Sequence, residues 1–145
     1  MKDQAIQEIF STINNDPENF YYYRHLISRH KIQDYLLNMP AEIWIPLVKI
    51  RTQNHKLPVE VYSWHQTFLP RAERKCTICS RNEIGDELHF VFFCPVFDED
   101  RRKLLPGFVD GPKTLVKFIK LLNSSDITIL RGFTKLLNII FGVFQ

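Results

Sequence analysis

The sequence predicts a small, mainly α-helical domain that surrounds an irregular, loop-rich centre. Three observations lead to this fold class. Apolar residues recur at helical spacing toward both ends of the chain, this periodicity is absent over residues 52–81, and prolines and glycines separate the periodic segments. A length of 145 residues suits one domain, and 45% hydrophobic residues suffice for a buried core, which excludes a disordered or collagen-like chain.

The N-terminal part of the chain is expected to be helical. Helices are predicted over residues 3–13 and 20–39, each followed within a few residues by a proline that ends it. A third apolar stripe covers residues 43–50, where Pro46 either begins or kinks the helix, because an interior proline removes one hydrogen bond. Residues 1–48 therefore form an N-terminal helical segment of the predicted domain.

The C-terminal part is expected to be helical as well. A charged segment at residues 98–103 predicts one or two helical turns, and an amphipathic helix is predicted over residues 114–122. Ser124 or Ser125 is expected to cap a last, strongly apolar helix. Residues 106–145 are thus interpreted as a C-terminal helical hairpin that packs with the rest as one domain.

The strongest chemical signal is the spacing of three cysteines and one histidine. Cys76, Cys79, His89 and Cys94 give the pattern C-x2-C-x9-H-x4-C, which is typical of a zinc site with four tetrahedral ligands. An odd number of cysteines does not suit a disulfide framework, and His89 supplies the missing fourth ligand. Residues 49–105 are therefore predicted to bind one structural zinc ion, and the C-x2-C turn can form a short β-hairpin.

The second ligand pair constrains the local backbone. In a helix that begins at Asp86, Cys94 would lie about 140° around the axis from His89 and could not share its metal. The helix is therefore expected to end before Cys94, and Pro95 supports this because it keeps the preceding residue out of the helical region. Asp86 is expected either to cap the helix or to accept a hydrogen bond from the second ring nitrogen of His89.

Two other uses of these cysteines fit the sequence less well. A redox C-x-x-C needs a strand before it and a helix starting at its first cysteine, whereas the residues after Cys76 are typical of a turn. A catalytic zinc keeps one position open for water, whereas four protein ligands close the shell.

The residues around the ligands resemble the zinc-binding segment at the C-terminus of non-LTR (LINE-type) retrotransposon reverse transcriptases. The resemblance covers residues 49–102 and rests on both the ligand spacing and the flanking motifs. These motifs are Asn54-His55-Lys56-Leu57-Pro58, Glu60, Trp64, Pro70-Arg71-Ala72-Glu73-Arg74, Glu83-Ile84-Gly85-Asp86-Glu87, His89-Phe90, Cys94-Pro95 and Phe97. Tyr62 and Ser63 depart from the family, in which many members carry a Gly-Arg pair there.

The resemblance implies a segment that binds RNA or DNA beside a polymerase, with the same four zinc ligands. The sequence contains no Tyr/Phe-x-Asp-Asp polymerase core and no nuclease pattern, so the chain is expected to be non-catalytic, as a terminal piece or a remnant of such an element. Beyond nucleic acid, a polymerase core or another protein is a possible partner under this interpretation.

The charge distribution suggests where nucleic acid would bind. The net charge of +3 conceals a balance of +5 over residues 49–81, next to an acidic stretch. A binding strip with phosphate contacts and stacking side chains is predicted from Arg51, His55, Lys56, Trp64, Arg71, Arg74, Lys75 and Arg81. Two alternatives stay open: Arg74 and Lys75 can simply balance the zinc thiolates, and Trp64 can be a core residue.

The runner-up function is a protein-interaction or scaffold module in which zinc only stabilises the fold. The N-terminal residues lack the apolar run of a signal peptide, and no segment reaches the length of a membrane span. The sequence therefore predicts an intracellular protein of the nucleus or cytoplasm with no membrane partner.

Overall fold

The structure is a computed structural model that describes residue 4 and residues 38–63 and 68–145. The described part is mainly helical with irregular connections, which confirms the predicted fold class. Apart from residues 4, 38 and 39, the helices predicted over residues 3–13 and 20–39 lie outside the described residues, and so does Trp64.

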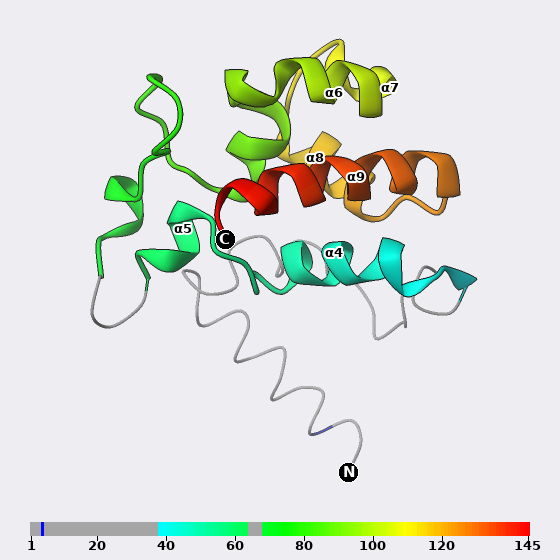
Figure 1. Ribbon diagram of the computed structural model, residues 1–145, viewed down its shortest axis with the longest axis horizontal. Helices are drawn as coiled ribbons and strands as arrows, with labels where there is room; N and C mark the ends of the chain where they lie inside the picture. The colour runs from blue at the N-terminus through cyan, green and yellow to red at the C-terminus, as the bar shows by residue number, and fades with distance from the viewer. Residues whose placement is uncertain (1–3, 5–37, 64–67) are drawn as a thin grey trace.

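Three helices form the layered body of the fold. Helix α9 (Ile127–Val143) lies in the middle, with α4 (Ala41–Arg51) on one side and α6 (Asp98–Leu104) on the other (Figure 1). Apolar residues recur every three or four positions along α9, so a continuous stripe faces these neighbours. The buried members of the stripe are Leu130, Phe133, Leu136, Leu137 and Ile140.

Helix α4 continues through its proline. It begins at Ala41, after Pro40, and runs to Arg51 with Pro46 in its interior, so Pro46 does not begin the helix. Pro46 is buried, and the Thr134 hydroxyl of α9 donates a hydrogen bond of 3.0 Å to the carbonyl of Ile43. This buried polar contact fixes the position of α4 along α9.

The remaining helices are short. They are α5 (Pro58–Val61), the 3-10 turn η1 (Arg71–Glu73), α7 (Pro106–Val109) and α8 (Leu115–Leu122). The predicted helices at 98–103 and 114–122 are confirmed, and the Thr114 hydroxyl caps α8 by accepting a hydrogen bond from the amide of Lys117.

The predicted cap of the last helix was wrong. Neither Ser124 nor Ser125 caps α9; Asp126 does, because its carboxylate accepts hydrogen bonds from the amides of Thr128 and Ile129 at 2.9 and 3.4 Å. A carboxylate at this position also faces the positive end of the helix dipole. Ser124 instead accepts a hydrogen bond from the amide of Asp126.

The irregular centre carries the predicted cysteines and histidine. We call residues 74–97 the knuckle. It contains one antiparallel bridge between Lys75 and Ile84, then the π-helical turn η2 (His89–Phe93) and the 3-10 turn η3 (Pro95–Phe97). The short β-hairpin allowed at the C-x2-C turn is thus reduced to a single bridge.

None of the helices in the described ranges has the length and apolar composition needed to traverse a lipid bilayer.

Candidate metal centre

The four predicted ligands come together at the knuckle. One donor atom from each of Cys76, Cys79, His89 and Cys94 lies within 4.8 Å of the other three. Cys79 Sγ and His89 Nε2 are 3.5 Å apart. Cys76, His89 and Cys94 are buried and Cys79 is half-buried, so the four side chains can hold one metal ion largely shielded from water.

The first ligand pair is positioned by the bridge that precedes it. The amide of Cys76 donates to the carbonyl of Glu83, and the amide of Gly85 donates to the carbonyl of Arg74, at 2.9 and 2.8 Å. Within the turn, the amides of Ile78 and Cys79 donate hydrogen bonds to the Cys76 sulfur. These hydrogen bonds favour the thiolate form that a metal requires.

Gly85 allows the second strand of the bridge to lie close to its neighbours. A Cβ at this position would meet Pro58 of α5 at 3.0 Å and the Cα of Cys76 at 3.1 Å. A larger residue would therefore push the C-x2-C turn away from α5.

The second ligand pair is brought together by a π turn. The amide of Cys94 donates to the carbonyl of His89 at 2.7 Å, a hydrogen bond between residues five apart. This wider turn places Cys94 near His89, whereas an α-helical turn would rotate Cys94 away. Cys94 itself is extended, with φ −62° and ψ 119°, and Pro95 follows it, so the predicted end of the helix before Cys94 is confirmed.

A buried arginine stabilises the carboxyl end of the π turn. Arg101 of α6 is 1% exposed, and its guanidinium donates to the carbonyls of Phe90, Val91 and Cys94 at 3.1, 2.6 and 3.0 Å. The same side chain pairs with Asp98. The sequence did not predict this role of Arg101, because the residue belongs to a basic cluster that is expected to be exposed. Only the orientation of the carbonyl groups in the π turn shows that Arg101 is their hydrogen-bond donor.

The outer partner of His89 is Glu83. Its Oε2 lies 2.9 Å from His89 Nδ1, which leaves Nε2 free to bind a metal. Of the two roles predicted for Asp86, the structure confirms the cap: Asp86 Oδ1 accepts a hydrogen bond of 2.8 Å from the His89 amide. The contact with the second ring nitrogen, assigned to Asp86 as the alternative, belongs to Glu83, which the Lys75–Ile84 bridge brings beside the ring.

Burial also sets the protonation of the thiols. Burial, opposed by a hydrogen bond from the Val96 amide and assisted by the nearby thiols of Cys76 and Cys79, raises the pKa of Cys94 to about 12. The pKa of Cys76 is raised as well, mainly by burial. Both groups are protonated near neutral pH when no cation is bound, so metal binding releases protons and depends on pH.

Comparison of the chain with protein-family models, with curated proteins and with solved structures gives no match in any of the three. The function must therefore be argued from the site itself.

Three members of the predicted binding strip, Arg51, Arg74 and His55, are buried and hold the fold together, so their side chains are not exposed to a nucleic acid. Arg51 is 4% exposed and donates to the carbonyl of Leu122 and to Asn123 at the end of α8. Arg74 is 1% exposed and donates to the carbonyls of Leu69 and Val59.

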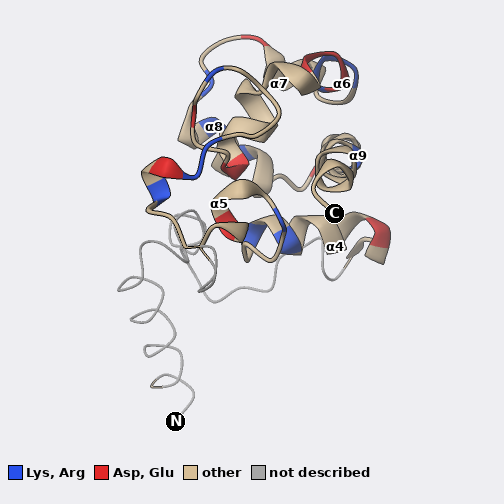
Figure 2. Ribbon diagram, turned by 60° about the vertical axis from the view of Figure 1, so that its left-hand side comes forward, with Lys and Arg blue, Asp and Glu red and all other residues tan. Residues whose placement is uncertain are grey.

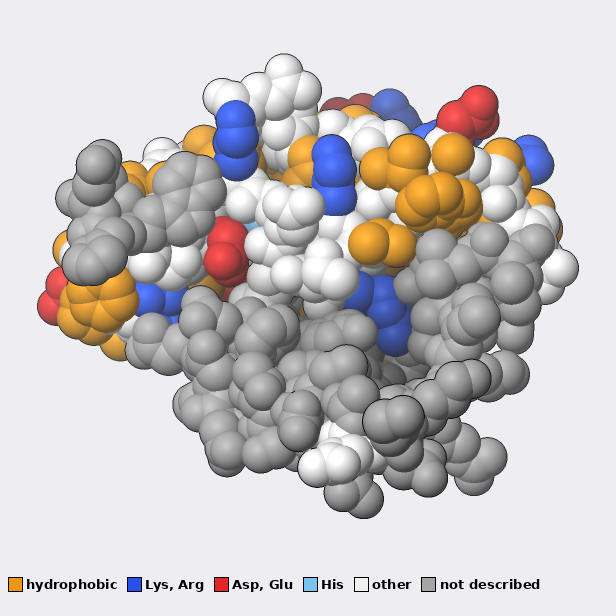
Figure 3. All heavy atoms as spheres, turned by 90° about the horizontal axis from the view of Figure 1, so that it is seen from below, with side chains coloured by type: hydrophobic (Ala, Val, Ile, Leu, Met, Phe, Trp, Pro, Cys, Tyr) orange, Lys and Arg blue, Asp and Glu red, His pale blue; other side chains and the backbone are white. Residues whose placement is uncertain are grey.

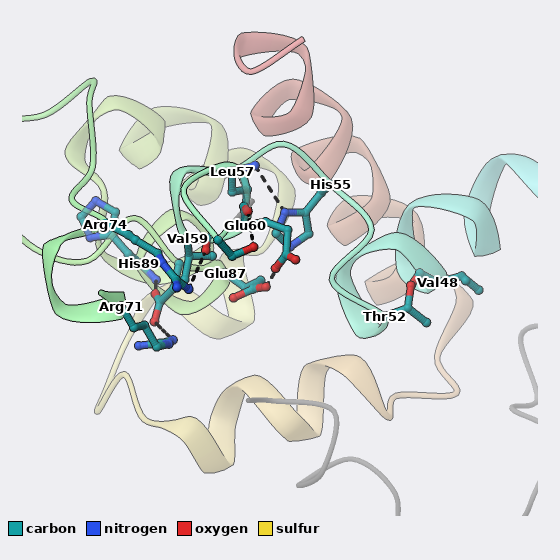
Figure 4. Close-up of polar contacts among 12 residues, drawn as sticks. Val48, Thr52, His55, Leu57, Val59, Glu60, Arg71, Arg74, Glu87 and His89 are labelled. Atoms are coloured by element: carbon teal, nitrogen blue, oxygen red, sulfur yellow. Dashed lines mark hydrogen bonds and ion pairs between the residues drawn. The ribbon is translucent and has the colours of Figure 1, made fainter. Parts of the chain in front are cut away.

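His55 is the third of these residues. Its Nδ1 accepts a hydrogen bond from the amide of Leu57, so Nε2 carries the proton and donates to Glu87 at 2.8 Å. The ring also stacks on Phe141 of α9. Figure 4 shows His55 beside Glu87 and Glu60, in a polar cluster that joins the start of α5 to the π turn.

Glu60 is the titratable member of this cluster. Burial, opposed by His55 and Arg74 and assisted by Glu87, raises the pKa of Glu60 to about 7. The carboxyl group is therefore half-ionised near neutral pH, and ionisation is opposed by the same packing that holds α5 in place.

The other members of the strip differ in exposure. Lys56 and Arg81 are exposed and Lys75 is half-buried, whereas Arg71 lies 3.1 Å from Asp86 in an ion pair. In Figure 2, basic and acidic segments alternate around the knuckle, so the predicted strip is not one uniformly basic face.

Two lysines at the start of α8 contact the π turn. Lys113 and Lys117 place their ammonium groups over the rings of Phe93 and Phe92, 5.8 and 5.9 Å from the centroids. Lys120 is exposed.

Proposed function

We propose that the chain is a non-catalytic, zinc-stabilised module that binds nucleic acid through the exposed surface of the knuckle. The proposal of a bound metal rests on three thiol groups and one imidazole nitrogen that lie within 4.8 Å of one another. Four protein donors close a tetrahedral shell and leave no position for substrate water, which supports a structural metal.

The types of donor atom and their separation support zinc as the metal. Thiolate and imidazole ligands in a tetrahedron favour zinc over calcium, magnesium or manganese. Zinc bond lengths of about 2.3 Å to sulfur and 2.0 Å to nitrogen require a sulfur–nitrogen separation of about 3.5 Å in a tetrahedron. The measured separation of Cys79 Sγ and His89 Nε2 is 3.5 Å, which agrees with this value.

Nucleic-acid binding is supported by the cations that remain accessible. Lys75 immediately precedes Cys76, and Arg81 stands two residues after Cys79. Lys56 is exposed near the end of the loop between α4 and α5. They can contact phosphates without disturbing the core. The resemblance of residues 49–102 to the reverse transcriptase zinc-binding segment points to the same kind of ligand.

The proposal is tested on the zinc-loaded protein by fluorescence anisotropy with labelled RNA and DNA over a salt titration. We expect affinity to fall as salt rises, and the triple change K56Q/K75Q/R81Q to reduce the slope of log affinity against log salt by about 2 to 3 units. K120Q, at an exposed lysine on α8, is the matched control and should leave that slope within one unit of the wild-type value. Absence of salt-dependent binding at low ionic strength would overturn the proposal.

A second function is favoured by a different observation. Apolar side chains are exposed on the helical body, where Ile45, Val116, Ile139 and Val143 are 41%, 62%, 39% and 50% exposed. In Figure 3, hydrophobic side chains gather toward the right-hand end of the face shown, while basic side chains are dispersed over it. A scaffold module that docks on a protein would use such a surface. Self-association that nucleic acid does not alter would favour this alternative.

A further inference from the structure

An open depression lies between the two turns that carry the cysteines. One wall comes from the C-x2-C turn and the other from the residues after Cys94. The lining residues are Thr77, Ile78, Cys79, Ser80, Pro95 and Val96. Only Cys79 among them is a candidate metal ligand, so the rest of this surface has no part in holding the metal.

The lining combines apolar surface with hydrogen-bonding groups. Val96 is 51% exposed although it is a large hydrophobic residue, and Ile78 and Pro95 stand beside it in the lining. Thr77 and Ser80 are exposed and add two hydroxyl groups. A surface of this kind suits a flat ring with polar edges better than a purely apolar or purely charged ligand.

The charge of the site decides which part of a nucleic acid can enter. Zinc with three thiolates has a formal charge of −1, and the Glu83 carboxylate lies against His89. A phosphate is therefore repelled from the part of the lining at Cys79, whereas the amino and imino groups of a base are attracted to it. Arg81 follows Ser80 in the chain and is exposed, so a cation adjoins the lining residues.

We propose that this depression accepts one unpaired base of a single-stranded nucleic acid, with the adjoining phosphates directed toward Arg81. The inference rests on the proposed nucleic-acid-binding function and makes it more specific: the knuckle prefers single strands, because a base paired in a duplex cannot enter the depression.

The test compares single-stranded and duplex RNA of the same sequence, about 12 nucleotides long, by fluorescence anisotropy with the zinc-loaded full chain. We expect tighter binding of the single strand and a loss of about 5- to 10-fold in its affinity for V96S, with duplex affinity unchanged. T77A is a second variant, which removes a lining hydroxyl and should weaken single-strand binding by about 3-fold. V116S is the matched control, since Val116 is 62% exposed on α8 and lies outside the depression.

The outcomes separate the two proposals. Salt-dependent binding with equal affinity for both RNAs, unchanged in V96S and T77A, would overturn the base-binding site and leave the proposed function standing. A loss in V116S as large as that in V96S would also overturn it. No binding to either RNA would overturn both. Zinc content and circular dichroism of each variant, matching the wild type, exclude misfolding as the cause.

Discussion

The knuckle and the helical body bury different kinds of groups. In the body, α9 contacts α4 and α6 through leucine, isoleucine and phenylalanine side chains. In the knuckle, several fully buried side chains are charged or polar, among them Arg74, Glu87 and His89, and each has a hydrogen-bond partner. The domain therefore has two sources of stability, apolar packing in the helical body and directional polar contacts around the candidate metal site in the knuckle.

Removal of the metal should have the largest effect, and it should destabilise the knuckle more than the helical body. We expect C76S to lose zinc and an apparent stabilisation on the order of 10 kcal/mol at neutral pH. Amide hydrogen exchange should show loss of protection throughout residues 74–97 while α9 keeps part of its protection. Elemental analysis checks the zinc content, and S80A is the matched control in the same turn. Equal loss of protection in the knuckle and in α9 would show that the helical body depends on the metal as much as the knuckle does.

A cavity in the helical body should lower the stability of the fold and leave the metal centre intact. Phe133 is fully buried on α9, so F133A should lower the free energy of unfolding by about 3 to 5 kcal/mol. Zinc content should remain at one per chain, because no ligand is touched. K135A, at an exposed position of the same helix, should change stability by less than about 0.5 kcal/mol. Loss of zinc from F133A would contradict the separation of the two regions.

A third change tests the polar contacts without touching a ligand. R101M leaves the carbonyls of Phe90, Val91 and Cys94 without their guanidinium donor, and should lower the free energy of unfolding of the zinc-loaded protein by about 3 kcal/mol. Denaturant unfolding followed by circular dichroism measures the loss. R102M, at the exposed neighbouring position, should behave like the wild type. Equal stability of the two variants would mean that Arg101 does not stabilise the π turn.

The pH dependence of stability tests the cluster that joins α5 to the knuckle. The folded pKa of Glu60, about 7, lies above its ordinary value of 4.5, so ionisation opposes folding. The ionisation of Glu60 lowers the free energy of unfolding. This destabilisation is absent below pH 4.5, grows as the pH rises to about 7 and is constant above that. We expect E60Q to be more stable than the wild type by about 2 kcal/mol at pH 8, which is less than full linkage gives because the carboxylate is partly exposed.

At pH 4, E60Q and the wild type should have nearly equal free energies of unfolding, measured by denaturant unfolding. E42Q, at an exposed glutamate of α4, should show no such difference between the two pH values. A constant difference at all pH values would contradict the assignment to Glu60 ionisation.

The smallest effect is expected from a change of Glu83, whose carboxylate contacts Nδ1 of His89. E83Q should weaken zinc affinity by about 10-fold, because the amide orients His89 but no longer supplies a negative charge to the ring. Competition with a chromophoric chelator measures the affinity. E73Q, at an exposed glutamate of η1, should bind zinc as the wild type does.

The metal ligands could be predicted from sequence because their information is local. Residue type and spacing identify Cys76, Cys79, His89 and Cys94, and Pro95 fixes the end of the helix between the last two. The helices α6 and α8 were predicted for the same reason, since the charged run of the first and the apolar periodicity of the second each lie within a few residues.

Burial of the arginines could not be predicted in this way. A charge count treats Arg51, Arg74 and Arg101 as surface cations, but all three are buried because irregular backbone presents carbonyl groups that need donors. The direction of those carbonyls depends on tertiary structure. The same holds for Glu83, whose contact with His89 requires the bridge between Lys75 and Ile84.

The spacing of the contacts along the chain has a consequence for the order of folding. The candidate ligands lie within nineteen residues, whereas the Thr134–Ile43 hydrogen bond that fixes α4 on α9 joins residues 91 positions apart. Closing the longer loop costs about 1.4 kcal/mol more chain entropy than closing the shorter one. The knuckle is therefore expected to close first when metal is present, and the two ends of the described chain then assemble on a preformed centre.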